Sequence, residues 1–269
     1  MQRLSAFIEA PALWAPTLPD WATARAVFRG ETPPAQPPRP VPAPASLPPA
    51  ERRRAPKTVA LSLAAAEASV HASGRDPSSL LAVFACAHGD LPVIDEICRT
   101  LVHTPTLLSP TRFLHSIHNA PAGIWSQLAH NAHANTAVSG AACSFAHGLM
   151  EALVQCEAEQ CPVLLVAYDT AAVGALTHTT ACDSMLSIAL ILSPQAGVNT
   201  IARMDWSLGT AVDCPPSIAP GWAHALSRQA MAPALPLLDA LARQQATHIA
   251  WPLSPHRSLQ TGITPIPAP

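Results

Sequence analysis

The stretch Asn135-Thr-Ala-Val-Ser-Gly-Ala-Ala-Cys-Ser-Phe-Ala-His-Gly-Leu-Met-Glu-Ala-Leu153 decides the fold of this chain of 269 residues. Residues 136–139 read as a short strand, a Gly/Ala turn follows, and residues 143–159 follow an amphipathic helical pattern. This order can expose a side chain at a helix N-terminus, where backbone N–H groups and the helix dipole stabilise an anion. That position holds either Ala142, which is inert, or Cys143, which can be a nucleophile.

Outward from this stretch, continuous apolar runs alternate with helical patterns. Such runs are typical of strands buried on both faces of a sheet, and the expected strands are residues 80–87 and 162–168. Helices are expected at residues 55–72, 90–101 and 120–130. The alternation predicts an α/β fold with a mostly parallel sheet and helices on both faces. An antiparallel pair is expected from residues 185–192 and 200–206.

The chain is expected to form one domain over residues 1–269, since 49% of its residues are apolar and can supply a core. Residues 31–49 are rich in proline and cannot form a helix or a central strand, so they are expected to be a surface linker. Residues 213–220 are expected to be a loop. Residues 254–269 carry little apolar material and are expected to be a loosely held tail.

Composition limits the function classes. Charged residues make up only 12% of the chain, about half the usual share, which suggests that a partner covers part of the surface. The net charge of −2 gives no basic bias toward nucleic acid, and no apolar window is long enough to span a bilayer. Seven cysteines without CxxC spacing indicate reduced thiols in the cytoplasm, and twelve histidines without ligand spacing indicate no metal. We expect no cofactor.

Five segments together resemble a known family in their order and spacing. The most specific of them runs from Leu108 to Ser126 (LSPTRFLHSIHNAPAGIWS); the others are Trp14-Ala-Pro16, Leu47-Pro-Pro-Ala-Glu-Arg-Arg-Arg54, Phe84-Ala-Cys-Ala-His-Gly-Asp90 and Pro162-Val-Leu-Leu-Val-Ala-Tyr-Asp169. Over roughly residues 5–195 the chain resembles the amino-terminal half of β-ketoacyl synthases, which have a thiolase-like fold. It is most similar to the chain length factor-like proteins of bacterial aryl polyene clusters. A thiolase-like half fold is therefore expected.

The resemblance bears on the nucleophile. Counting from Asn119, with Ala122-Gly123 in register, places Ala142 where a synthase carries its catalytic cysteine, and a shift of one residue would place Cys143 there. The resemblance also implies that the two catalytic histidines and the lysine belong to a carboxy-terminal half. That half has no counterpart before Pro269. No catalytic residue is therefore expected.

The resemblance further implies that certain residues lie at a dimer interface or along an acyl tunnel. The candidates are Arg112, Phe113, Ser116, His118, Asn119, Thr136 and Val138. Some of them have a plainer alternative: Phe113 could be an ordinary core residue, and His118 with Asn119 could pin a loop to the next helix. Asp169 could cap the turn after its strand, and we assign it no chemistry.

The sequence thus predicts a non-catalytic, chain length factor-like subunit. It is expected to pair with a full-length β-ketoacyl synthase, to shape the acyl tunnel, and to meet an acyl carrier protein through that complex. Two alternatives remain open: a stand-alone acyltransferase or condensing enzyme that uses Cys143, and a scaffold protein that contacts no acyl chain.

Overall fold

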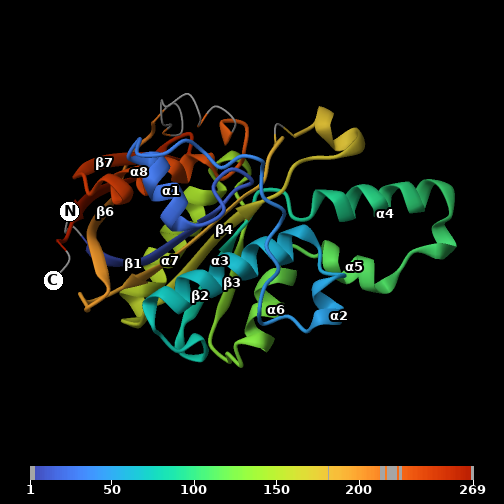
Figure 1. The fold of residues 1–269 in the computed structure, drawn as a ribbon, viewed down its shortest axis with the longest axis horizontal. Coiled ribbons are helices and arrows are strands. Elements are labelled where there is room, and N and C mark those ends of the chain that lie inside the picture. Colours follow the sequence, from blue (N-terminus) through green and yellow to red (C-terminus); the bar gives the residue numbers. More distant parts are fainter. Residues whose placement is uncertain (1–3, 181, 213–215, 217–222, 224–225, 268–269) are drawn as a thin grey trace.

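The computed structural model describes residues 4–180, 182–212, 216, 223 and 226–267. Its strands form one eight-stranded sheet in the order β3-β2-β4-β5-β1-β6-β8-β7 (Figure 1). The strands are β1 (Leu4–Trp14), β2 (Leu81–Ala85), β3 (Asn135–Val138), β4 (Val163–Asp169), β5 (Leu186–Ser193), β6 (Thr200–Thr210), β7 (Thr247–Ser254) and β8 (Arg257–Pro265).

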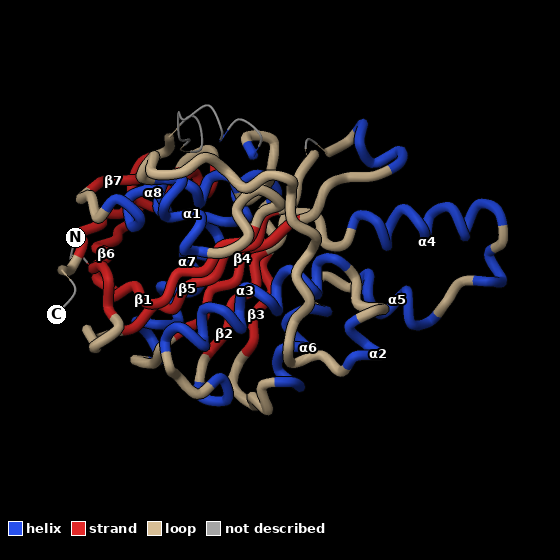
Figure 2. Tube along the Cα trace, viewed as in Figure 1, coloured by secondary structure: helices blue, strands red, loops and turns tan. Residues whose placement is uncertain are grey.

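Helices cover both faces of the sheet, as predicted (Figure 2). The helices are α1 (Trp21–Phe28), α2 (Pro49–Arg52), α3 (Lys57–Ser73), α4 (Leu91–His103), α5 (Pro110–Ser116), α6 (Ala120–Leu128), α7 (Ser144–Glu159) and α8 (Leu235–Arg243). One face carries α3 and α6, and the other carries α1, α7 and α8. The alanine-rich α3 ends where Gly74 takes the left-handed conformation that an L side chain resists.

The prediction of a mostly parallel sheet is wrong. Of the seven strand pairs in the described part of the chain, β2–β3 and β2–β4 are parallel and the other five are antiparallel. The apolar runs at β2 and β4 correctly marked buried strands, but burial on both faces does not fix strand direction. Because β4 to β5 is linked without a crossover helix, the chain can turn back and pair antiparallel there.

The predicted antiparallel pair of residues 185–192 and 200–206 is also wrong. The two strands do form, as β5 and β6, but β1 lies between them and pairs antiparallel with both. Strand β5 lies along residues 7–14 of β1, and β6 lies along residues 4–9. The connection between β5 and β6 therefore passes across β1, and the register of β1 shifts in this region.

A buried ion pair occupies this crossing. Glu9 is almost fully buried, and Arg75 holds it through two hydrogen bonds of 2.8 Å, from Nε to Oε2 and from Nη2 to Oε1. Arg75 also donates to Ser193 Oγ at the end of β5. A charge so buried is stable only when it is paired and hydrogen-bonded, so Arg75 compensates the charge of the central strand.

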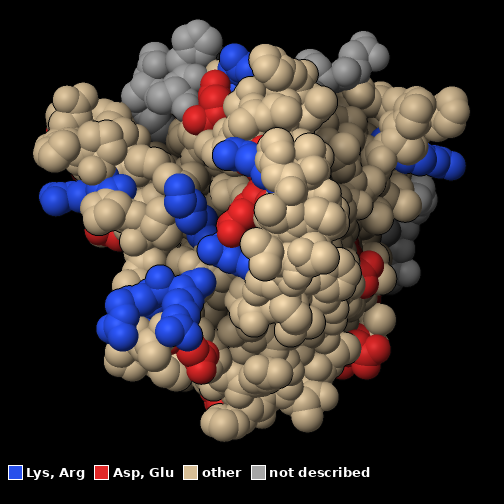
Figure 3. Space-filling model, turned by 90° about the vertical axis from the view of Figure 1, so that its right-hand side faces the viewer, with Lys and Arg blue, Asp and Glu red and all other residues tan. Residues whose placement is uncertain are grey.

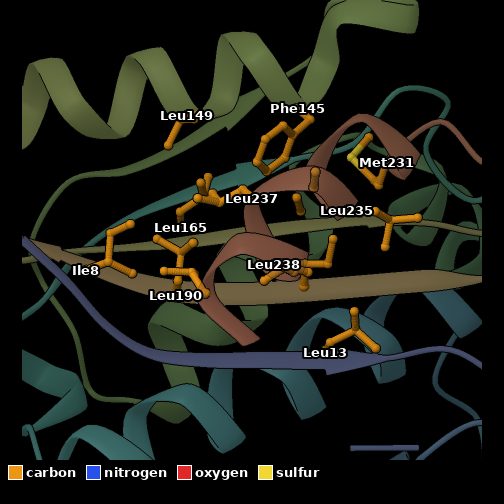
Figure 4. Close-up of a cluster of buried hydrophobic side chains, with 14 of the residues drawn as sticks. Ile8, Leu13, Phe145, Leu149, Leu165, Leu190, Met231, Leu235, Leu237 and Leu238 are labelled. Atoms are coloured by element: carbon orange, nitrogen blue, oxygen red, sulfur yellow. The ribbon is translucent and has the colours of Figure 1, made fainter. Parts of the chain in front are cut away.

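The main core lies between the sheet and α7, α8 and α1. Figure 4 shows Phe145 and Leu149 of α7 directed toward the side chains of the sheet, with Leu237 and Leu238 of α8 in the same cluster. A second core on the opposite face joins α3 and α6 to the sheet and includes Trp125. These two layers fix the ends of β2, β3 and β4, from which the loops of the candidate site begin.

The expected linker and tail differ in outcome. Residues 31–48 contain no helix or strand, and they are tied down where Leu47 is buried and Glu67 accepts hydrogen bonds from Ser46. The expected loosely held tail is wrong over residues 254–265, because β8 pairs with both β6 and β7. Leu259 and Ile263 alternate with polar residues along β8, and their side chains reach the core. Such alternation is typical of a strand, but it is hard to recognise in a segment with so few apolar residues. The loop expected at residues 213–220 lies, except for Pro216, outside the described residues.

Among the helices that the structure describes, none combines the length and the apolar character needed to cross a bilayer.

Replacing Arg75 with Met should leave the Glu9 carboxylate buried without a partner. We expect the free energy of unfolding to fall by about 3–5 kcal/mol, as for other broken buried pairs. Urea denaturation followed by circular dichroism measures this loss. The matched control is Arg203→Met, which breaks the exposed pair with Asp205 and should cost less than about 1 kcal/mol. Equal losses of unfolding free energy in the two variants would show that the buried pair stabilises the fold no more than the exposed pair does.

Candidate functional site

The candidate site lies where the three mutually parallel strands end. Strands β2, β3 and β4 run side by side, so their carboxyl ends meet at one edge of the sheet. The loops that leave this edge are residues 86–90 after β2, residues 139–143 after β3, and the segment that begins at Thr170 after β4. Loops at the carboxyl ends of parallel strands are a common location for sites in α/β proteins.

The turn between β3 and α7 has a constrained backbone. Ala141 has a φ of +49°, a conformation that costs an L residue energy and that often marks a functional turn. Ser144 holds the turn closed, because its Oγ accepts from Gly140 N–H at 2.9 Å and donates to the Ala141 carbonyl at 2.7 Å. A Cβ on Gly140 would lie 2.1 Å from His147 Nδ1, so only glycine fits there. His147 Nε2 is itself hydrogen-bonded to the Leu253 carbonyl.

The two candidate nucleophile positions differ in chemistry and surroundings. Ala142 is exposed at the tip of the turn and has no reactive group. Cys143 is half-buried, and burial raises the pKa of its thiol rather than lowering it. Reactive cysteines have a lowered pKa, which a nearby cation or base supplies. Within the described residues no side chain is hydrogen-bonded to the Cys143 thiol.

The chain between β2 and β3 forms an arm, residues 91–116, that projects from the body (Figure 1). The arm consists of α4, a short 3-10 turn and α5, and Arg112 of α5 joins Glu96 of α4 in an ion pair of 2.9 Å. Its large apolar side chains are exposed rather than packed: Leu101, Val102, Leu107, Phe113 and Leu114. Figure 3 views the side of the molecule that carries the arm, where uncharged surface predominates and Lys and Arg side chains gather toward the left.

The arm is pinned at its base. His118, just beyond α5, is hydrogen-bonded through Nε2 to the Cys86 carbonyl at 2.8 Å, which joins the outgoing and returning ends of the arm. Asp90 caps α4 by accepting from Val93 N–H, and it also accepts from Thr58 Oγ1 of α3. The base is therefore ordered although the apolar surface of the arm is exposed.

A buried carboxylate lies beside this base. Asp169, at the end of β4, accepts from Ala87 N–H at 2.8 Å and from Thr170 N–H at 3.1 Å. Burial raises the pKa of Asp169 to about 7, although the backbone hydrogen bonds oppose that shift. Sequence reasoning gave Asp169 only a capping role, which Thr170 N–H fits, and missed the bond to Ala87. The sequence feature that could have indicated a buried carboxylate is the position of Asp169 at the end of a strand whose preceding residues are apolar or aromatic.

Among the strands that the structure describes, β3 lies at one end of the sheet and pairs only with β2. The N–H groups of Ala82 and Cys86 donate to the carbonyls of Ala134 and Val138. Because alternate residues of a parallel strand bond to alternate sides, Asn135 and Ala137 direct their backbone groups away from β2, toward the free edge.

The structure brings some of the predicted residues together and separates others. Arg112, Phe113 and Ser116 lie on the exposed helix α5, so the alternative of Phe113 as a core residue is wrong: its side chain is 56% exposed. His118 lies at the arm base, and Asn119 begins α6 without a side-chain cap. The remaining two candidates lie on the edge strand β3, where Thr136 Oγ1 accepts from Gln155 and Val138 packs against the core.

In the part of the chain that the structure describes, no three His, Cys, Asp or Glu side chains gather as a metal ion would require.

The family follows from a comparison with family models. The model of the β-ketoacyl synthase N-terminal domain matches residues 20–256. The chain belongs to this family. No curated protein matches the chain in sequence.

Solved structures share the fold. A chain from the ketosynthase in complex with its chain length factor from Xenorhabdus doucetiae aligns with a TM-score of 0.73 and 20% identity, over 96% of this chain and 99% of that one. The ishigamide ketosynthase/chain length factor aligns with a TM-score of 0.72 and 14% identity, over 98% and 100%. A type II polyketide synthase acyl-carrier protein in complex with its ketosynthase gives 0.75 and 9%, also over 98% and 100%. The thiolase-like fold predicted from the sequence is therefore confirmed.

Asp169 should make the stability of the protein depend on pH. Its pKa is about 7 in the folded protein and near 3.8 when exposed, so the stability gained from proton binding is complete below pH 4 and is lost as the pH rises through 7. Between pH 5 and 8 this carboxyl should lower the free energy of unfolding by roughly 2–3 kcal/mol. Urea titrations at several pH values measure the slope.

The variant Asp169→Asn should remove this part of the slope, whatever its effect on absolute stability. Asp239→Asn, which changes a carboxylate in α8 paired with Arg243, is the matched control and should keep the slope. Identical slopes in the wild type and Asp169→Asn would contradict the role given to Asp169.

Proposed function

We propose that this chain is a non-catalytic, chain length factor-like subunit that pairs with a complete β-ketoacyl synthase. The observation that carries the proposal is the turn after β3, which retains the constrained backbone of a nucleophile turn but exposes Ala142. The nearby Cys143 offers no substitute, because burial raises the pKa of its thiol. A turn of this kind can support the geometry of a shared site without performing the covalent step.

The edge strand β3 provides the main pairing surface. Asn135 and Ala137 present free backbone groups on a strand without charge or proline, which is the arrangement that a partner strand can extend. The other end of the sheet is protected, because β7 contains Pro252 and an irregularity next to it. Such features block edge pairing, so we assign the partner to β3.

The arm provides the second part of the surface and the link to chain length. Its exposed large apolar side chains, which include Phe113 and Leu114 of α5, are of the kind that mark an interaction surface. We infer that α5 packs against the partner and that Phe113 lines one wall of the partner's acyl tunnel. The substrate is then a growing acyl chain, of the polyene type by family resemblance, on an acyl carrier protein that the complex recruits.

The comparisons support this reading by analogy of fold. Two of the similar structures are described as a ketosynthase with a chain length factor, and a third as an acyl-carrier protein with its ketosynthase. Identities of 9–20% carry the fold and not the activity, so partner and substrate are our proposal.

The pairing surface is tested by Ala137→Pro, which removes an outward N–H from β3 while leaving the bonds to β2 in place. We expect affinity for a full-length β-ketoacyl synthase from the same genome to fall at least tenfold, because one or more intermolecular hydrogen bonds are lost. Co-expression, size exclusion and titration by interferometry measure it.

Two further variants test whether the arm also contributes to affinity for the synthase. Leu114→Ser should also weaken the complex, whereas Val198→Ser, an equally apolar change at a turn residue 87% exposed and outside the arm, should not. Full affinity in Ala137→Pro would exclude pairing through β3.

The non-catalytic role is tested by Cys143→Ala in the assembled complex. We expect condensation to continue at nearly the wild-type rate, because the Cys143 thiol is not activated. Removal of a true nucleophile costs on the order of 10⁶-fold in a well-studied protease. A loss of that size in an intact complex would establish the alternative of a Cys143-dependent enzyme.

The tunnel role is tested by Phe113→Ala. Because Phe113 is largely exposed in the isolated chain, the variant should fold with little loss of stability. We expect a longer tunnel and products extended by one or more units, measured by mass spectrometry of the released chains. An intact complex with an unchanged product distribution would remove Phe113 from the tunnel wall.

A further inference from the structure

We propose that Glu151 of α7 selects the partner at the β3 edge: it favours a synthase whose facing helix carries Lys or Arg, and it disfavours a second copy of this chain. The inference rests on the proposed function, in which β3 pairs with a synthase. It extends the pairing surface from the strand to the helix that lies against it. Glu151 acts on the choice of partner and takes no part in chemistry.

The first argument is that hydrogen bonds tie the edge strand to one side of α7. Gln155 Nε2 donates to Thr136 Oγ1 of β3 at 2.9 Å. The same Nε2 donates to Glu151 Oε1, one helical turn earlier, at 2.8 Å. The three side chains form an ordered row that leads from β3 onto the helix. Glu151 is therefore held close to the free edge of the sheet.

The second argument is the geometry of pairing through β3. A complete β-ketoacyl synthase contains the same N-terminal domain, so it can present an equivalent strand that runs antiparallel to β3 about an approximate twofold axis. When the two strands overlap fully, this axis passes near the middle of Asn135–Val138, beside Thr136. Paired strands lie about 4.8 Å apart and packed helices about 8–10 Å apart, so α7 meets the equivalent helix of the partner. Glu151 lies at the middle of Ser144–Glu159 and therefore near the axis.

The third argument is the composition of the outer face of α7. Phe145 and Leu149 are directed toward the sheet (Figure 4), so the helical period places Glu151 and Val154 on the opposite face. Val154 is 45% exposed in the chain alone, and it lies three residues from Glu151 on the same side of the helix. An apolar contact flanked by a charge is the arrangement by which paired helices choose their partners.

The fourth argument is the charge of the helix. α7 contains Glu151, Glu157 and Glu159 but no Lys or Arg. Within the described part of the chain none of these three carboxylates joins an ion pair. In a pair of identical chains α7 would face α7, and Glu151 would face its own copy near the axis. Like charges that face each other across an interface exclude a wrong partner, whereas Lys or Arg at that place attracts.

Mixing two versions of this chain tests the geometry without a synthase. The wild type and Glu151→Lys should each self-associate weakly, since like charges meet in both. An equimolar mixture should associate at least about tenfold more tightly, because opposite charges then face each other. Sedimentation velocity at low salt measures the three association constants. The control is Glu31→Lys in the loop after α1, outside β3 and α7, which should give no gain when mixed with the wild type.

Carbodiimide cross-linking of the mixture locates the contact. Lys57 is the only lysine in the natural chain, so the amine introduced at position 151 gives a distinct product. We expect a cross-link between this amine and the Glu151 carboxylate of the wild-type copy, identified by mass spectrometry of the isolated dimer. A mixture that associates no better than the separate chains would overturn the proposal. A dimer cross-linked only through other positions would do so as well.

Affinity for the synthase tests the cationic partner. Glu151→Lys should weaken binding at least about tenfold and Glu151→Gln by a smaller factor, because the first adds repulsion and the second only removes attraction. Added salt should weaken the wild-type complex more than the Glu151→Gln complex. Equal affinity of the wild type and Glu151→Lys would overturn the assignment of Lys or Arg to the partner helix. A synthase that binds no version of the chain would remove the proposed function, whereas the mixing experiment would still decide how the helices meet.

Discussion

The architecture depends on a charge placed in its central strand. Glu9 lies at the crossing of β1 and the β5–β6 connection, and Arg75 reaches it from beyond the end of α3. The pair joins elements that are distant in sequence: the first strand, the first long helix and, through Ser193, the end of β5. An apolar residue could fill the same space, but it could not require a guanidinium at that point. The pair thereby ties β1 to the residues that follow α3 and to the end of β5.

Local patterns predicted local structure well. The helices expected at residues 55–72, 90–101 and 120–130 are present as α3, α4 and α6, and the apolar runs became β2 and β4. The order of strands in the sheet was not predictable, because the insertion of β1 between β5 and β6 depends on contacts across almost the whole chain. Strand β8 was missed since its inward residues are few and separated by polar ones.

In the candidate site, too, local features could be predicted from the sequence and contacts between distant segments could not. Spacing from Asn119 located the turn at Ala142, and the structure confirms a constrained turn after a strand. Whether Cys143 is reactive depends on burial and on neighbours from other strands, which spacing cannot give. The importance of Asp169 was hidden for a similar reason: its partner Ala87 lies 82 residues away in sequence. For Phe113 the family resemblance favoured an interface or tunnel position, whereas the residues alone left an ordinary core position open; its exposure excludes the core position.

The unequal ends of the sheet have a consequence for stoichiometry. A sheet with two open edges can add strands at both and grow without limit, as fibres do. Here one end is Asn135–Val138, open and uncharged, and the other carries Pro252 with a disturbed register. Under the proposed pairing a partner strand covers the open end, and the end that carries Pro252 is a poorer template for a further chain. Such a sheet would favour a closed pair over continued growth.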